Sequence, residues 1–322
     1  MLKLDIPSAE VKSEYKKRFL KQIVRRVKGE LKGRDLSNAA REILLPGWKT
    51  DHPNTSVLEH LLVDEPIALK KLNDKVWEDL QKLPCWKRPT KAALNAVFDY
   101  KSLIDQSKSN SYWLASKVGR NTCAYCNRTY TLTVVKDEGK NDSERITRPT
   151  FDHWYAHADY PLMSMSLFNL IPSCSICNSS VKTSTPFTTE THIHPYVHRD
   201  GHPKLTFEAS LLPGDPAKWT VVIKTEQESL EERTVADLKL NEIYAYHGEL
   251  EVKDLMEFKE KYTDGYLSDL LNKLLKDSNG LLSLGDVYRM LFGTEIDEDK
   301  HLDRPLSKMK HDLLIEMGVI KK

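Results

Sequence analysis

The chain has 322 residues and a formal net charge of only +1, with 40% hydrophobic and 30% charged residues. This length allows one large domain or a few smaller ones, and the composition is that of a soluble globular protein. No stretch approaches the roughly 18 consecutive apolar residues that a membrane span needs. Residues 1–17 carry acidic and polar groups where a secretory signal has an apolar run. We therefore expect a cytoplasmic protein with no membrane association.

Residues 1–120 are predicted to form a helical lobe that starts with a basic helix. Apolar residues recur at helical spacing over 11–32, and eleven basic residues stand against four acidic ones between Val11 and Glu42. Such a face is compatible with nucleic-acid binding, and it is also typical of an ordinary solvated surface. Three further helices, each opened by a capping serine or a proline, are predicted over 37–47, 65–83 and 89–105.

The remaining chain divides into a segment of short strands and a second helical region. Over 121–201 the sequence has β-like runs and most of the cysteines, which predicts a compact insert held by a metal. Residues 202–322 contain one alternating strand pattern, at 219–225, followed by helical spacing at 232–262 and 304–318. The predicted fold class is therefore α+β and mostly helical.

Four of the five cysteines form two Cys-x-x-Cys pairs, "CAYC" at 123–126 and "CSIC" at 174–177. In a reducing cytoplasm two such pairs indicate a tetrahedral Zn²⁺ site rather than disulfides. A site closed by four thiolates has no open coordination position, so a structural role is expected for this zinc. The remaining cysteine, Cys85, is interpreted as a small buried apolar side chain. The expected zinc ligands are Cys123, Cys126, Cys174 and Cys177.

Polar residues suited to phosphodiester hydrolysis lie close to these pairs. Asp152, His153 and Asn169 lie between them, and Asn178 and Lys182 follow the last cysteine. The reaction requires an activated water, a cation near the phosphate and a fixed geometry. A neutral histidine can deprotonate water, and a carboxylate with an amide oxygen can hold Mg²⁺. Simpler roles stay open: the asparagines could cap turns or helices, and Lys182 could be a solvated surface residue.

Four motifs resemble one family: "TCAYCNRTY", "FDHWYAHADYP", "NLIPSCSICNSSVK" and "HIHPY". They are similar to HNH endonucleases, which have a ββα-metal core. The likeness is greatest to the HNH nucleases of bacterial anti-phage systems, of the Septu-type and retron-linked kind, which work beside an ATPase. The strong match covers residues 122–196. It implies a zinc-stapled HNH core at 121–201. An N-terminal helical lobe at 1–120 precedes this core, and a C-terminal strand and helical region at 202–322 follows it. The C-terminal region is a candidate for partner docking.

The resemblance also implies a role for each matching residue. His153 takes the position of the general base, Asp152 and Asn178 the positions of the Mg²⁺ or Mn²⁺ ligands, and Asn169 that of the residue holding the loop. Asn178 stands where the family name has a histidine, and an asparagine there still supplies an oxygen ligand. The implied position of Lys182 is near the phosphate.

Two histidines are further candidates for contact with a phosphate. His157 stands where many relatives have a lysine, so it can replace that lysine only as a protonated ring or a neutral donor. His194 belongs to a histidine-rich segment whose side chains at 192 and 194 would share one side of a strand. We expect this segment to line a wall of the active cleft.

The resemblance implies a nucleic-acid substrate, either DNA or a structured RNA, and an ATPase as protein partner. An HNH core contacts mainly backbone and phosphate, so it does not by itself select one class of nucleic acid. A second interpretation belongs to another functional class, a non-catalytic zinc-ribbon adaptor that presents a surface to nucleic acid or protein. The adaptor interpretation explains the cysteines but not Asp152 or Asn178.

Overall fold

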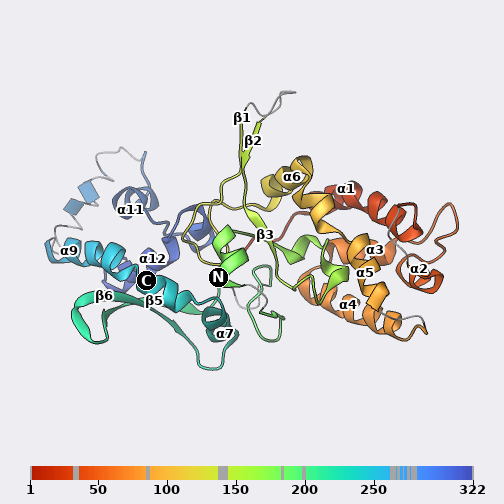
Figure 1. The fold of residues 1–322 in the computed structure, drawn as a ribbon. Helices are drawn as coiled ribbons and strands as arrows, with labels where there is room; N and C mark the ends of the chain where they lie inside the picture. The colour runs from red at the N-terminus through yellow and green to blue at the C-terminus, as the bar shows by residue number, and fades with distance from the viewer. Residues whose placement is uncertain are drawn as a thin grey trace.

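The structure is a computed structural model that describes residues 2–31, 36–84, 88–136, 144–182, 185–197, 201–261 and 281–320, with residues 266, 269, 270, 272, 273 and 276. Helices predominate and the strands form two-stranded antiparallel sheets, which confirms the predicted α+β class. Figure 1 shows the N-terminal helices at one end of the molecule, the C-terminal elements at the other end and β3 between them.

The N-terminal helices bury their apolar faces in a hydrophobic core that continues through the rest of the chain. Ser8, Ser37 and Ser107 cap α1, α2 and α6, because each side-chain oxygen accepts a hydrogen bond from a first-turn N–H group. The elements are α1 (Ala9–Lys28), α2 (Asn38–Leu44), α3 (Ser56–Val63), α4 (Pro66–Gln81), α5 (Arg88–Val97), a π-helical turn (Lys101–Asp105) and α6 (Lys108–Val118).

Helix α1 differs from the prediction in two respects: the residue at which it ends and the burial of one of its basic residues. It ends at Lys28 because Gly29 adopts the left-handed conformation, with φ at 78°, and closes the helix. Arg26 is buried rather than solvated. Its guanidinium donates hydrogen bonds to the carbonyl oxygen of Val97 at 3.2 Å and to the hydroxyl of Ser102 at 2.8 Å. Arg26 therefore joins α1 to α5 and the π-helical turn that follows it.

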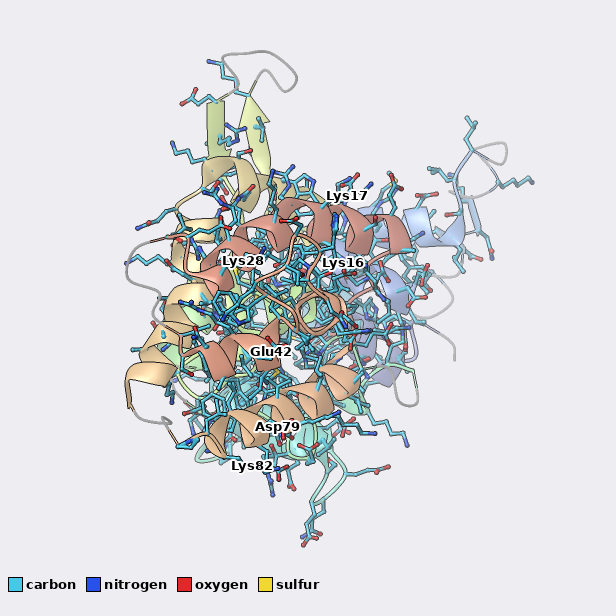
Figure 2. The ribbon with its side chains drawn as sticks, turned by 90° about the vertical axis from the view of Figure 1, so that its right-hand side faces the viewer. Lys16, Lys17, Lys28, Glu42, Asp79 and Lys82 are labelled. Carbon is cyan, nitrogen blue, oxygen red and sulfur yellow. The ribbon has the colours of Figure 1, made fainter. Side chains whose placement is uncertain are left out.

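The outer surface of this lobe carries charges of both signs. Two of the lysines on α1 form ion pairs, Lys12 with Glu65 and Lys16 with Glu59, both at 3.1 Å. Figure 2 shows further lysines of α1 on the same face of the molecule as the acidic Glu42 and Asp79. The excess of basic residues in the sequence of α1 therefore does not produce a uniformly positive surface.

The middle of the chain contains two pairs of strands. β1 (Val134–Lys136) and β2 (Glu144–Thr147) form a hairpin that projects from the molecule (Figure 1). β3 (Thr150–His153) pairs with β4 (Leu170–Ser173), which places Asp152 opposite Ile171. β4 is buried along its whole length. The other elements are 3₁₀ turns (Pro161–Met163 and Leu167–Asn169) and a helical turn after β4 (Cys177–Val181).

The C-terminal region opens with a hairpin that includes the predicted strand and continues with helices. The stretch with predicted helical spacing, 232–262, forms helices up to Lys261 that are divided at Lys239, whose left-handed backbone, with φ at 51°, separates α7 from α8. No helix in the described part of the chain is both long and apolar enough to cross a membrane. The elements are β5 (Leu205–Leu212), β6 (Asp215–Thr225), α7 (Leu230–Asp237), α8 (Leu240–Ala245), a π-helical turn (Gly248–Val252), α9 (Lys253–Lys261), α11 (Leu284–Phe292), a 3₁₀ helix (Glu298–Asp303) and α12 (Ser307–Glu316).

Both ends of the chain are hydrogen-bonded to the cysteine-rich segment. The N–H of Leu2 donates to the carbonyl oxygen of Ala124 at 2.8 Å. The buried hydroxyl of Tyr15 on α1 donates to the carbonyl oxygen of Met165 at 2.9 Å. From the C-terminal side, the N–H of Leu306 donates to the carbonyl oxygen of Asn127 at 2.6 Å. The segment over 121–197 is therefore the structural centre on which the two helical regions pack.

Replacing Tyr15 with phenylalanine should lower the free energy of unfolding by about 1 to 3 kcal/mol, because the buried carbonyl oxygen of Met165 loses its donor. Urea denaturation would measure the change. Tyr246→Phe is the matched control, since the side chain of Tyr246 is 84% exposed and its loss of a hydroxyl should leave stability unchanged. Equal stabilities of the two variants would contradict the structural role of Tyr15.

Candidate metal centre and active site

The four cysteines of the two Cys-x-x-Cys pairs meet in one buried cluster. Their sulfur atoms all lie within 4.8 Å of one another, and all four residues are free thiols. Cys123 and Cys126 lie in the loop after α6, whereas Cys174 and Cys177 follow directly on β4. The two cysteine pairs are far apart in the sequence. The antiparallel pairing of β3 with β4 brings the second pair back to the first.

This cluster fits a tetrahedral metal ion such as zinc. Four sulfurs at the usual Zn–S distance lie about 3.8 Å apart, which is compatible with the observed spacing. The N–H of Cys177 points at the sulfur of Cys174 at 3.4 Å, as a donor to a thiolate does. Burial raises the pKa of the Cys123 thiol, whereas hydrogen bonding to Cys123 lowers the pKa of Cys174. Ionising all four buried thiols therefore requires a cation among them.

Asp152, the predicted magnesium ligand, is buried at the centre of a polar network. One oxygen of its carboxylate, Oδ2, accepts a hydrogen bond from the hydroxyl of Tyr125 at 2.6 Å and lies 3.0 Å from the ammonium of Lys182. Among the described residues no donor is found on the other oxygen, Oδ1. Tyr125 stands between the two cysteines of the first pair, so the metal cluster and Asp152 are linked by a single side chain.

Lys182 is buried and does not face solvent, where a contact with a substrate phosphate would be made. Its side chain is only 2% exposed, and its ammonium donates to the carbonyl oxygen of His153 at 2.7 Å in addition to pairing with Asp152. A buried ion pair of this kind needs further hydrogen bonds to offset the loss of solvation, and Tyr125 and the carbonyl of His153 supply them. The observed contacts show Lys182 holding the strand end that carries Asp152 and His153.

His153, the predicted general base, is a neutral ring with one nitrogen available. Its Nε2 lies 3.0 Å from the carbonyl oxygen of Ser164, which can only accept, so Nε2 carries the proton and Nδ1 the lone pair. Burial lowers the pKa of His153 to about 4. The ring of Tyr100 packs edge-on against it at 4.7 Å, and the ring of His157 lies 5.3 Å away.

Asn169 fastens the loop that follows His153. Its side-chain oxygen accepts from the N–H of Tyr155 at 2.7 Å, and its amide donates to the carbonyl oxygens of Tyr155 at 3.1 Å and Met163 at 3.0 Å. The residue is completely buried. These bonds match the loop-holding position that was expected for Asn169, and they show that it does not face a substrate.

Asn178, the second predicted magnesium ligand, lies in the helical turn after β4. Its N–H donates to the carbonyl oxygen of Cys174 at 3.1 Å, so the second cysteine pair fixes its backbone position. The residue is half-buried and lines the same cavity as Asp152 and His153. The structure thus brings together three residues that the sequence separates by up to 26 positions.

This cavity, which we call the His153 cavity, has a volume of about 710 Å³. One wall comes from the segment that contains Asp152, His153, His157, Asn178 and Lys182. The opposite wall comes from the N-terminal lobe and was not predicted, because nothing in the sequence before residue 120 signals a chemical role. Its polar residues are Asn95, Asp99, Tyr100, Lys101 and Asp105.

His194 lies outside the His153 cavity, contrary to the expectation that its segment lines that cleft. The side chain is 2% exposed, its Nδ1 accepts from the N–H of Tyr196 at 3.1 Å, and its ring packs against Trp154 at 4.3 Å. The segment is also not a strand. The neighbouring His192 is held by Asp237 of α7 at 2.8 Å. His192 therefore joins the central segment to the C-terminal region, whereas His194 packs within the central segment.

Comparisons of the chain with family models, with curated proteins and with solved structures find no match.

Replacing Cys177 with serine should reduce the zinc content of the purified protein to background, because three thiolates hold the ion much more weakly than four. Metal analysis and a thermal unfolding curve would measure the loss of the ion and of the stability that depends on it. Cys85→Ser is the control, since Cys85 belongs to neither pair and lies outside the described residues. Full zinc content in Cys177→Ser would show that the cluster does not hold a metal.

The two asparagines should differ in their effect on stability. Asn169→Ala removes bonds to three buried backbone groups and should lower the free energy of unfolding by about 3 kcal/mol or more. Asn178→Ala removes a half-buried side chain without such bonds and should cost less than about 1 kcal/mol. Urea unfolding of both variants provides the comparison. Similar losses in the two would show that Asn169 is not the fastener of this loop.

Proposed function

We propose that this protein is a metal-dependent endonuclease of the HNH type that hydrolyses phosphodiester bonds in nucleic acid. The observation that carries the proposal is the gathering of Asp152, His153 and Asn178 in one cavity beside the cysteine cluster. The order of the elements supports it as well. β3, β4 and the helical turn after β4 follow one another as the parts of a ββα-metal core do.

His153 is proposed as the general base. Because burial lowers its pKa to about 4, the ring is neutral at pH 7. Its Nδ1 can therefore take a proton from a water molecule, while Ser164 and Tyr100 hold the ring in place. Asn169 acts indirectly, since the loop that it fastens contains the backbone around His157 and Ser164.

Asp152 and Asn178 are proposed to hold the catalytic Mg²⁺ or Mn²⁺. A carboxylate oxygen and an amide oxygen are ligands that these hard cations prefer, and Oδ1 of Asp152 is the oxygen that its protein partners leave uncommitted. When bound, the ion would neutralise charge that develops on the phosphate and the leaving oxygen. Zn²⁺ at the four cysteines is proposed as a structural ion that fixes the positions of β4, Tyr125 and Asn178 relative to one another.

Lys182 and His157 are proposed to act at different distances from the substrate. Lys182 positions the carboxylate of Asp152 and the backbone of His153, as its buried contacts indicate. His157 is exposed at the mouth of the same cavity, where it could contact a phosphate. We further propose, from the motifs alone, a role in bacterial anti-phage defence in the cytoplasm beside an ATPase partner.

A zinc-ribbon adaptor is the alternative from another functional class. An adaptor would need the cysteine cluster but would not need a half-buried neutral histidine beside a carboxylate and an amide. Chelation of the labile divalent ion separates the two functions. An adaptor keeps binding its partner in EDTA as long as its zinc is retained, whereas a nuclease loses turnover.

His153→Ala should reduce cleavage by at least about 100-fold, because it removes the general base, while zinc content and fold are retained. Wild type and variant would be incubated with plasmid DNA and with total transfer RNA in Mg²⁺, in Mn²⁺ and in EDTA. His52→Ala, on the exposed surface of the N-terminal lobe, is the matched control and should cut as wild type does.

Cleavage by the wild type only with added metal would establish the nuclease and name its substrate class. Normal cleavage by His153→Ala would exclude the proposed base. If neither protein cuts, the same assay is repeated with the candidate ATPase partner added.

A further inference from the structure

The His153 cavity is poorly suited to attract a polyanion by itself. Its lining includes four carboxylates and two lysines; Lys182 is paired with Asp152, and Arg148 outside the lining is paired with Asp105, which leaves an excess of one negative charge. Before a divalent ion binds, a phosphate entering this cavity meets a net negative lining. Most of the binding energy for a nucleic acid should therefore come from another surface, because phosphate contacts dominate such affinities. The carboxylates are those of Asp99, Asp105, Asp152 and Asp159.

A second cavity, with the opposite charge, lies between α6 and the base of the β1–β2 hairpin. It has a volume of about 560 Å³ and is lined by Arg18, Arg120 and Arg145, which we call the arginine cavity. Among the described residues that line it there is no aspartate or glutamate. Tyr112 and Trp113 add aromatic rings to the wall. Figure 1 shows α6 beside the projecting hairpin.

Two of these arginines are held in place by neighbouring side chains. The guanidinium of Arg18 donates to the side-chain oxygen of Asn110 at 2.9 Å and lies over the ring of Trp113 at 4.5 Å. Arg120 forms an ion pair with Asp5, so part of its charge is balanced. Arg145 lies on β2 opposite Val135 and is half-buried. Prearranged guanidinium groups of this kind suit phosphate, which they can bind through two parallel hydrogen bonds.

The arginine cavity and the His153 cavity lie along one continuous stretch of backbone. β2 carries Arg145, and the chain continues through Arg148 into β3, which carries His153. Arg148 pairs with Asp105 of the His153 cavity at 2.9 Å. Eight residues of extended chain span at most about 26 Å. One strand of duplex DNA carries a phosphate per about 3.4 Å of axis, so this distance corresponds to at most about eight nucleotides.

We propose that the arginine cavity binds the phosphodiester backbone of a nucleic acid a few nucleotides away from the bond that enters the His153 cavity. This inference rests on the proposed nuclease function, because it assumes that the His153 cavity is where the bound nucleic acid is cleaved. It assigns nucleic-acid binding to the base of the hairpin and the adjoining Arg18 of α1, and not to the α1 lysines Lys12 and Lys16, which are paired with Glu65 and Glu59. The backbone chemistry is shared by DNA and RNA.

The test is a binding experiment that does not depend on cleavage. His153→Ala protein, in EDTA, is titrated against a DNA duplex, a DNA single strand and transfer RNA over a series of salt concentrations. The titrations are repeated with His153→Ala protein, the background protein, that also carries Arg145→Glu, Arg145→Lys or the control substitution Lys82→Glu. Lys82 is an exposed lysine of the N-terminal lobe, and Figure 2 shows it at the far end of that view from the β1–β2 hairpin.

Arg145→Glu should weaken binding about tenfold or more and reduce the slope of log affinity against log salt by about 0.9 for a duplex, or about 0.7 for a single strand. Arg145→Lys keeps the charge but loses the paired guanidinium hydrogen bonds, so it should keep the salt slope while its affinity falls between those of the background protein and Arg145→Glu. Lys82→Glu, with the same change in charge, should bind as the background protein does. Zinc content and circular dichroism would show that each variant is folded, and the probe bound most tightly names the nucleic-acid class.

Two results would overturn the inference. One is equal affinity of Arg145→Glu and Lys82→Glu, either because neither weakens binding or because both weaken it alike through net charge, and both cases exclude a local contact. The other is absence of binding to every probe by the background protein. In either case the proposed function is judged separately, by metal-dependent cleavage with the wild type and its loss in His153→Ala.

Discussion

The closure of the four-cysteine cluster is the constraint on which the rest of the structure depends. Four buried thiols within 4.8 Å of one another are suited to be ligands of a cation, because a cation offsets the cost of burying several thiolates together. The cluster joins the loop after α6 to the end of β4. Because the hydroxyl of Tyr244 also bonds to the carbonyl oxygen of Cys126, the C-terminal region is attached to the same point.

The candidate active site follows from that closure through two side chains. Tyr125 lies within the first cysteine pair, and Lys182 lies five residues after the second. Both reach the same carboxylate oxygen of Asp152 only when the two pairs are brought together. A buried carboxylate needs such partners, because an isolated charge in the interior is strongly unfavourable. The cysteine cluster and the geometry around His153 are therefore parts of one network.

The two cavities differ in the charge of the residues that line them. The His153 cavity is rich in carboxylates and suits a divalent cation, whereas the arginine cavity suits phosphate. If the protein is a nuclease, substrate held by the arginines would be offered to a site that becomes favourable for phosphate once a cation is bound. The N-terminal lobe contributes to both cavities, through Tyr100 in one and Arg18 in the other, so it does more than support the fold.

The sequence by itself determined the features that depend on local spacing. The paired cysteines, the capped helices, the strand at 219–225 and the α+β class were all readable from residue type and period, because each requires only neighbours along the chain. Two features could not be predicted from local spacing: the break between α7 and α8, and the end of α1 at Lys28 instead of residue 32. Each depends on one residue with left-handed backbone.

Tertiary structure alone decided which polar residues share a cavity. His194 carries the same chemistry as His153 but is buried against Trp154, and Lys182 turns inward to Asp152 instead of outward. Asp99 and Tyr100 reach the site from a distant helical lobe. A sequence lists donors and acceptors, but whether each one meets water, a metal or another side chain depends on how the helices and strands pack. Local patterns do not contain that information.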